Sequence, residues 1–217
     1  MMPRAPGILL AALLALAAGC ATTAGYDYSA YRAHPPRSIL VLPPLNQSTA
    51  VEGTYSYLAT VTQPLAELGY YVFPVAVVDQ FLKENGMPTA GEMHQIPLAK
   101  AAETMGADAV LFVTLEQYGS KFQVFNSAVV VSASANLVDT RTGTLLWQGK
   151  GTAQQDSSGG NSNGLLGALV AAVVSQMLTS STDAAHNVSR QANVNLFNAS
   201  QRGLPYGPYS PKAGTAP

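Results

Sequence analysis

The stretch Ser38-Ile39-Leu40-Val41-Leu42, which ends at Pro43-Pro44, decides the fold class. A short unbroken apolar run is typical of a strand buried on both faces, because a strand with one wet face would alternate apolar and polar residues. Residues Asp108 to Glu116 contain a second run of this kind. Strands buried on both faces need helices on both sides, so the two runs predict an α/β domain.

The segment between these two strands begins with a helical pattern. Residues 52–68 place apolar side chains at spacings of three and four, which predicts a helix, and Gly69 is a suitable end. Pro64 is expected to kink this helix or to begin a second one. The apolar positions are Tyr57, Leu58, Val61, Leu65 and Leu68. The patterns that follow predict a strand at 70–75 and helices at 77–84 and 98–105.

The second half of the chain alternates. Residues 129–138 have apolar side chains at every second position, which predicts a strand with one wet face. Asp139 to Gly143 has the composition of a turn, and residues 144–151 should return antiparallel as an edge hairpin with Leu145 and Trp147 on one face. Phe122 and Val124 alternate in the opposite phase, and a bulge within residues 125–127 would reconcile them. The sequence therefore predicts an α/β (α+β) fold with a mixed sheet of about five strands covered by helices.

Two C-terminal helices should follow within residues 165–198, and a tail at 201–217. Residues 165–178 carry no charge, which leaves three alternatives: a central core helix, an interface with a partner or a second copy, or insertion into a membrane. An interface would use Leu165, Leu166, Leu169 and Val173. The tail has several prolines and no periodicity, so we expect it to be extended. It is either a loose end or a docking strip that presents Tyr206 and Tyr209.

The N-terminus has the pattern of an export signal. Arg4 precedes an apolar run of signal-peptide length, which is too short to span a bilayer, and small residues lead up to Cys20. This resembles a bacterial lipobox, although Ala17 stands where the motif prefers leucine. The alternative is a secreted protein with a chance cysteine. We expect residues 1–19 to be removed and Cys20 to carry lipid (palmitate or similar acyl chains), since stable attachment takes two or more chains.

The predicted mature chain has one domain. Cleavage would leave 198 residues (217 minus 19), of which 20–37 are expected to be a lipidated tether and 38–200 the folded part. The tether contains Pro35-Pro36 and several tyrosines, which could lie on the membrane or on the domain. By resemblance to known sorting rules, Ala21 after the cysteine favours the periplasmic face of the outer membrane.

The sequence contains no recognisable catalytic, metal or cofactor motif. Charged residues are 11% of the chain and acidic ones slightly outnumber basic ones, which argues against nucleic-acid binding. Lipidation of Cys20, the single cysteine, would leave no thiol nucleophile. His34, His94 and His186 are far apart, and none has a second histidine or a carboxylate at metal-ligand spacing. We therefore expect no enzymatic activity, no cofactor and no metal.

Several motifs together resemble a family of outer-membrane lipoproteins of unknown function. The motifs are the lipobox, Pro36 to Pro44 with Asn46, Gly106 to Leu111, Leu137 to Asp139 with Thr142-Gly143 and Leu146-Trp147, and Tyr206 to Pro211. The strand-turn-strand at 138–143 is also similar to periplasmic domains of CsgG and of the N-terminal part of TolB, which are α/β modules that bind other proteins. The resemblance brings no catalytic residues with it.

The resemblance implies a role in the envelope. The family is often encoded beside a CsgG-like lipoprotein, which implies a shared complex for export or surface assembly. CsgG itself forms a pore from membrane hairpins, whereas here only residues 122–138 offer strand of that length and their phase breaks, so we do not expect a channel. Two alternatives stay open: an activator of peptidoglycan synthesis, as similar lipoproteins are, and an envelope hydrolase with a perturbed carboxylate or histidine in a polar cleft.

Overall fold

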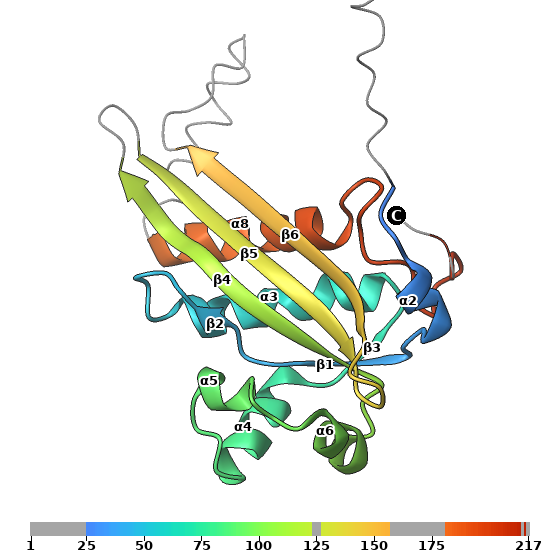
Figure 1. Ribbon diagram of the computed structural model, residues 1–217. Coiled ribbons are helices and arrows are strands. Elements are labelled where there is room, and N and C mark those ends of the chain that lie inside the picture. Colours follow the sequence, from blue (N-terminus) through green and yellow to red (C-terminus); the bar gives the residue numbers. More distant parts are fainter. Residues whose placement is uncertain (1–24, 123–126, 157–180, 214, 216–217) are drawn as a thin grey trace, which may run out of the picture.

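The computed structural model describes residues 25–122, 127–156, 181–213 and 215. It confirms the predicted mixed α/β architecture, with six strands where about five were expected. The strands are ordered β3-β1-β4-β5-β6, and a short strand β2 also pairs with β4. Figure 1 shows three long strands, β4 to β6, with α3 and α8 on one face and α4 to α6 gathered near β1.

The first half of the sheet is parallel. Strand β1 (Ser38–Val41) lies between β3 (Tyr71–Val72) and β4 (Ala109–Phe122), and β2 (Leu45–Asn46) joins β4 farther along. Ile39, Leu40 and Val41 are fully buried, as expected of a strand covered on both faces. Strand β3 is much shorter than the predicted strand at 70–75, because Pro74 caps the helix that begins at Val75.

Helices cover both faces of this half. They are α3 (Gly53–Glu67), α4 (Val75–Glu84), α5 (Ala90–Met93) and α6 (Leu98–Met105). Helix α2 (Ser29–Ala33) lies against β6 instead. Helix α3 runs through Pro64 without a second helix beginning there. It ends before Gly69, whose φ of +89° is the left-handed conformation that glycine tolerates best. The sequence prediction missed α5, which is held by a capping box between Thr89 and Glu92.

The second half of the sheet is antiparallel and longer than expected. Strand β5 (Ser127–Asp139) pairs with β4 and with β6 (Leu145–Asp156). Most of the predicted bulge at 125–127 lies outside the described residues. Phe122 ends β4 and pairs with Ser127 at the start of β5, so Phe122 and residues 129–138 belong to two different strands. A register shift lies between Leu115 and Gln117.

A second register shift corrects the predicted face of the hairpin. The pairing of β5 with β6 shifts between Leu137 and Val138, opposite Leu146. Leu146 and Trp147 are both buried in the core, whereas Leu145 is 43% exposed. Leu145 and Trp147 therefore do not share a face, because the irregularity interrupts the alternation.

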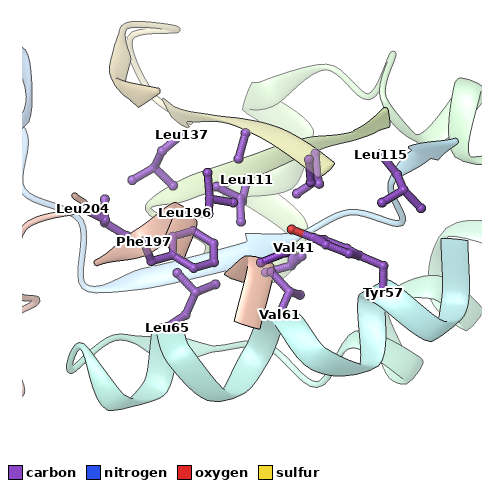
Figure 2. Close-up of a cluster of buried hydrophobic side chains, with 14 of the residues drawn as sticks. Val41, Tyr57, Val61, Leu65, Leu111, Leu115, Leu137, Leu196, Phe197 and Leu204 are labelled. Carbon is purple, nitrogen blue, oxygen red and sulfur yellow. The ribbon is translucent and has the colours of Figure 1, made fainter. Parts of the chain in front are cut away.

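The main core lies between the sheet and the pair α3 and α8 (Ser181–Phe197). In Figure 2, Tyr57, Val61 and Leu65 of α3 point toward strand residues such as Leu111 and Leu137. Helix α8 supplies Leu196 and Phe197, and Phe197 stacks on Trp147 with ring centroids 5.7 Å apart. All five apolar positions predicted for residues 52–68 are buried.

Both ends of the described chain fold back onto the domain. Residues 25–37, expected to be part of a tether, include α2, and Tyr28 and Tyr31 are buried in the main core. At the other end Leu204, within the expected tail, is fully buried in the same core. The folded part therefore begins before Ser38 and continues past residue 200.

Candidate interaction surface

Tyrosine hydroxyls join the two chain ends. Tyr28 Oη donates to the carbonyl of Gly203 at 2.6 Å, and Tyr70 Oη donates to the carbonyl of Pro205 at 2.5 Å. Tyr31 Oη lies 2.6 Å from Tyr70 Oη, so Tyr31 is the donor in that pair. Burial raises the pKa of both Tyr31 and Tyr70, which keeps these hydroxyls protonated as donors. The three tyrosines have a structural role that the sequence did not reveal.

The C-terminal segment continues along the end of α3. Gly207 N donates to Leu68 O at 2.9 Å, and Tyr209 N donates to Gly69 O at 3.1 Å. The approach requires two glycines, because a Cβ on Gly69 would lie 2.4 Å from Ser210 N and one on Gly207 would lie 2.4 Å from Gly69 O. The segment is therefore fixed to the domain by its backbone.

The two tyrosines singled out in the tail have different environments. Tyr206 is half-buried, packs against the main core and has Lys212 Nζ 5.3 Å from its ring centroid. Tyr209 is 65% exposed, although its backbone is held in place. Of this pair, Tyr209 is the residue with most surface available to a partner.

A polar groove of about 360 Å³ lies beside this surface, along the edge strand β6. Tyr26 closes part of the edge, since Gln148 N donates to its hydroxyl at 2.8 Å. Lys150 lines the groove and pairs with Glu116 on the outer face of the sheet, an ion pair that lowers the pKa of Glu116. The other lining residues are Ser134, Asn136, Gly149, Leu196, Ala199 and Arg202. The groove offers hydrogen-bonding groups and the positive charge of Lys150 and Arg202.

Two of the three histidines, His94 and His186, have structural partners. His94 Nε2 lies 2.9 Å from Pro43 O, and burial lowers the pKa of His94. His186 Nδ1 is 3.4 Å from Ser56 Oγ, which accepts a shorter hydrogen bond from Tyr118. Among the described residues, no three histidine, cysteine or acidic side chains gather as a metal site. The hydrolase alternative therefore gains no metal site in the part of the chain that the structure describes.

Asp139 holds the turn between β5 and β6. Burial raises the pKa of its carboxyl, but hydrogen bonds from Thr142 and from the Arg141 backbone outweigh burial and lower it. Oδ1 accepts from both backbone amides, at 2.8 Å from Thr142 N and 3.0 Å from Arg141 N. The second oxygen lacks a hydrogen bond and lies 3.5 Å from Arg141 Nη2. This charge is explained by the turn, so we assign no catalytic role to it.

The other predicted site residues lie outside the described residues. They are Cys20 and the four interface candidates Leu165, Leu166, Leu169 and Val173. Within the described ranges, no helix has both the length and the apolar character to cross a membrane.

Comparison with known proteins gives a consistent match. Residues 26–209 match the model of the family described as "Putative lipoprotein GNA1162-like". The chain is 45% identical over 201 residues to a "Putative lipoprotein" of Neisseria meningitidis serogroup B, covering 92% of this chain and 93% of that protein.

The solved structures include a lipoprotein of the same name. In the crystal structure of lipoprotein GNA1162 from Neisseria meningitidis, the sequence is 47% identical to this one. The match covers 67% of this chain and 100% of that chain, with a TM-score of 0.54. The C-terminal domain of LpoB from Salmonella enterica is 19% identical over 66% of this chain and 93% of its own, with a TM-score of 0.40. A similarity at that level carries no functional argument.

Proposed function

Because the chain belongs to the GNA1162-like lipoprotein family, we propose that it is an envelope lipoprotein that is attached through Cys20 and acts as a non-enzymatic accessory protein. The proposed partners are other envelope proteins of an export or surface-assembly complex, with a CsgG-like lipoprotein as the leading candidate. The observation that carries the accessory role is the fixed C-terminal segment, which holds Tyr209 exposed beside the end of α3.

The anchor is tested at Cys20. A lipidated N-terminus needs the thiol, so Cys20→Ser should abolish acyl labelling and leave the chain uncleaved or soluble. The neighbouring Ala21→Ser variant should label normally and serves as the control. Acyl-labelled membrane protein from the Cys20→Ser variant would overturn the anchor.

The proposed location is the periplasmic face of the outer membrane. Ala21 supports this, by resemblance to sorting rules in which aspartate at that position retains a lipoprotein at the inner membrane. Density-gradient separation of the two membranes should recover the unaltered chain with the outer membrane and the Ala21→Asp variant with the inner one. Recovery of the unaltered chain in the inner-membrane fraction would contradict this location.

The partner is tested by placing a photo-crosslinking amino acid at position 209 of the full chain in cells. An aromatic side chain that is exposed but fixed at its backbone is a suitable contact, since little conformational freedom is lost on binding. Position 55 on α3, where Tyr55 is also exposed, is the matched control. A crosslink from 209 to a CsgG-like lipoprotein, absent from 55, supports the proposal.

Other crosslinking results decide between the alternatives. A crosslink from 209 to a peptidoglycan synthase would favour activation of cell-wall synthesis. A crosslink to a second copy alone would replace the accessory role with homo-oligomerisation.

The apolar segment 165–178 is the second proposed contact. Leu165, Leu166, Leu169 and Val173 would form an interface if the segment meets a partner, whereas a core helix would need them for stability. Leu169→Ser separates the two roles. If Leu169→Ser abolishes the crosslink from position 209 but leaves the thermal midpoint of unfolding unchanged, the segment is an interface. A lower thermal midpoint supports a core helix.

A further inference from the structure

The described chain begins close to the proposed anchor. Gly25 is five residues beyond Cys20, and a chain of five residues spans at most roughly 18 Å. The residues that follow cannot lengthen this connection, because Tyr28 and Tyr31 are buried in the main core. A lipid at Cys20 would therefore keep the N-terminal end of the domain within about two nanometres of the lipid surface.

This end of the molecule is basic, unlike the chain as a whole. It consists of residues 25–34 and 198–213, which lie at the same end in Figure 1. Together they contain Arg32, Arg202 and Lys212 and a single carboxylate, Asp27, and Glu67 at the end of α3 lies next to the residues that bind the C-terminal segment. The whole chain has 11 basic and 12 acidic side chains, so positive charge is concentrated where the chain leads toward Cys20.

The three cations are available to an external partner. Arg32, Arg202 and Lys212 are all exposed, and none forms an ion pair within 4.0 Å in the described part of the chain. Both guanidinium groups lie near enough to Tyr28 to act on its hydroxyl electrostatically. Tyr28 is itself bonded to Gly203, so two segments far apart in sequence hold the charges together.

We propose that this basic end, defined by Arg32, Arg202 and Lys212, lies against the phosphate groups of an anionic lipid surface. The proposal rests on the proposed anchor at Cys20, which brings the end within reach. Basic residues near anionic lipids are attracted at short range, and each contributes on the order of fivefold in apparent affinity. The lipid at Cys20 then keeps the chain at the membrane. The three cations determine which end of the domain faces it.

The test uses the full lipidated chain in vesicles of phosphatidylethanolamine and phosphatidylglycerol with a quencher on the lipid headgroups. A fluorophore is attached to a cysteine introduced at Ala213, at the basic end, or at Gln117, on β4. Both positions are exposed. We expect quenching at 213 to be at least about twice that at 117, because a charge-held end stays within roughly a Debye length of the headgroups. We also expect this excess to fall at high salt.

Charge removal supplies the control. The variant Arg32→Gln/Arg202→Gln/Lys212→Gln should lose the excess quenching at 213, whereas Lys83→Gln/Lys100→Gln/Arg190→Gln, which removes equal charge elsewhere, should keep it. Chain that fails to float with vesicles at high salt would refute the anchor itself. Chain that floats but shows equal quenching at the two positions, or the same excess in both triple variants, would refute the orientation and leave the anchor standing.

Discussion

The two halves of the sheet bury their strands differently. In β1, Ile39 and Val41 belong to the cluster under α3 and α8, while Leu40 belongs to a second cluster formed with α4 to α6. In β5, Leu137 is fully buried but Asn136, its neighbour, is exposed. Helices on both faces produce an unbroken apolar run, whereas cover on one face produces the alternation seen around Asn136. Nearer its start β5 is buried on both faces, since Val130 and Ser132 are buried as well as their neighbours. The comparison explains why a single sheet carries two sequence patterns.

Neighbouring substitutions give the sharpest test of this difference. In β1, Ile39→Ala and Leu40→Ala should each reduce the free energy of unfolding by about 2–5 kcal/mol, because both neighbours are fully buried. In β5, Leu137→Ala should cost a similar amount, but Asn136→Ala should stay within about 0.5 kcal/mol. Urea unfolding measures all four. A loss at Asn136 comparable to that at Leu137 would show that β5 is also covered on its outer face.

The core face of the antiparallel half should tolerate no added atom at Gly151. A Cβ there would lie 2.3 Å from Ala192 O and 2.7 Å from Leu196 N, both in the backbone of α8. Gly151→Ala should therefore displace the helix and cost about 3 kcal/mol, at the upper end of overpacking effects.

Gly91→Ala is the matched control for that substitution. Its nearest neighbour would be 3.9 Å away, so the added methyl should be neutral or slightly stabilising within α5. Equal thermal midpoints for the two variants would mean that α8 does not pack on β6 as described.

Polar groups on the core face should also be more sensitive than exposed ones. Tyr57 Oη donates to Asn193 Oδ1 at 2.5 Å, and Asn193 Nδ2 donates to Thr60 Oγ1 at 2.9 Å, with all three residues buried. Tyr57→Phe should cost about 1–3 kcal/mol, because it leaves a buried amide oxygen without a donor. Tyr55→Phe, on the exposed side of the same helix, should change stability by less than about 0.5 kcal/mol. Equal losses in chemical denaturation would contradict this assignment.

The smallest expected effect is the pH dependence of the stability that Asp139 contributes in the antiparallel half. The pKa of Asp139 is lower in the folded state, so its contribution is complete above the unfolded-chain value of about 4 and is lost as pH falls through the folded value. Asp139→Asn keeps an acceptor but loses the charge. Hydrogen bonds to a charged group are stronger than those to a neutral one by about 1 kcal/mol, so the variant should be less stable by that order at pH 7. The difference should begin to shrink below about pH 4 when thermal midpoints are followed from pH 7 to 3. A constant difference across that range would argue against the charge as the cause.

Periodicity predicted those parts of the fold that have a repeating pattern. The runs at 38–42 and 108–116, the helix at 52–68 and the alternation at 129–138 all indicated real elements. Helix α5 also had a signal, the Thr89 and Glu92 capping box, which an apolar pattern does not reveal in four residues. The irregularity at Leu146 had no signal in the sequence, because a bulge changes the phase of the alternation without changing the composition.

The candidate surface was harder to predict. Prolines and missing periodicity made 201–217 look like a separate tail, yet Tyr70 bonds to Pro205 and Leu204 enters the core. The first is a hydrogen bond from a side chain to a backbone carbonyl, and the second is the burial of a single apolar residue. Neither produces a repeating pattern in the sequence. Tyr206 and Tyr209 could be singled out by composition, but only the structure separates the half-buried residue from the exposed one.

The bonds between the chain ends also impose an order of events during synthesis. The pair Tyr28 and Gly203 closes a loop of 175 residues, and Tyr70 with Pro205 closes one of 135. Contacts of such separation are slow to form, and these need residues that are synthesised long after the N-terminal segment. The N-terminal segment therefore lacks these partners until the C-terminal segment has been made. In the export that we propose, it would cross the membrane before they form. An enzyme that modifies Cys20 would meet it before the domain has closed around its own beginning.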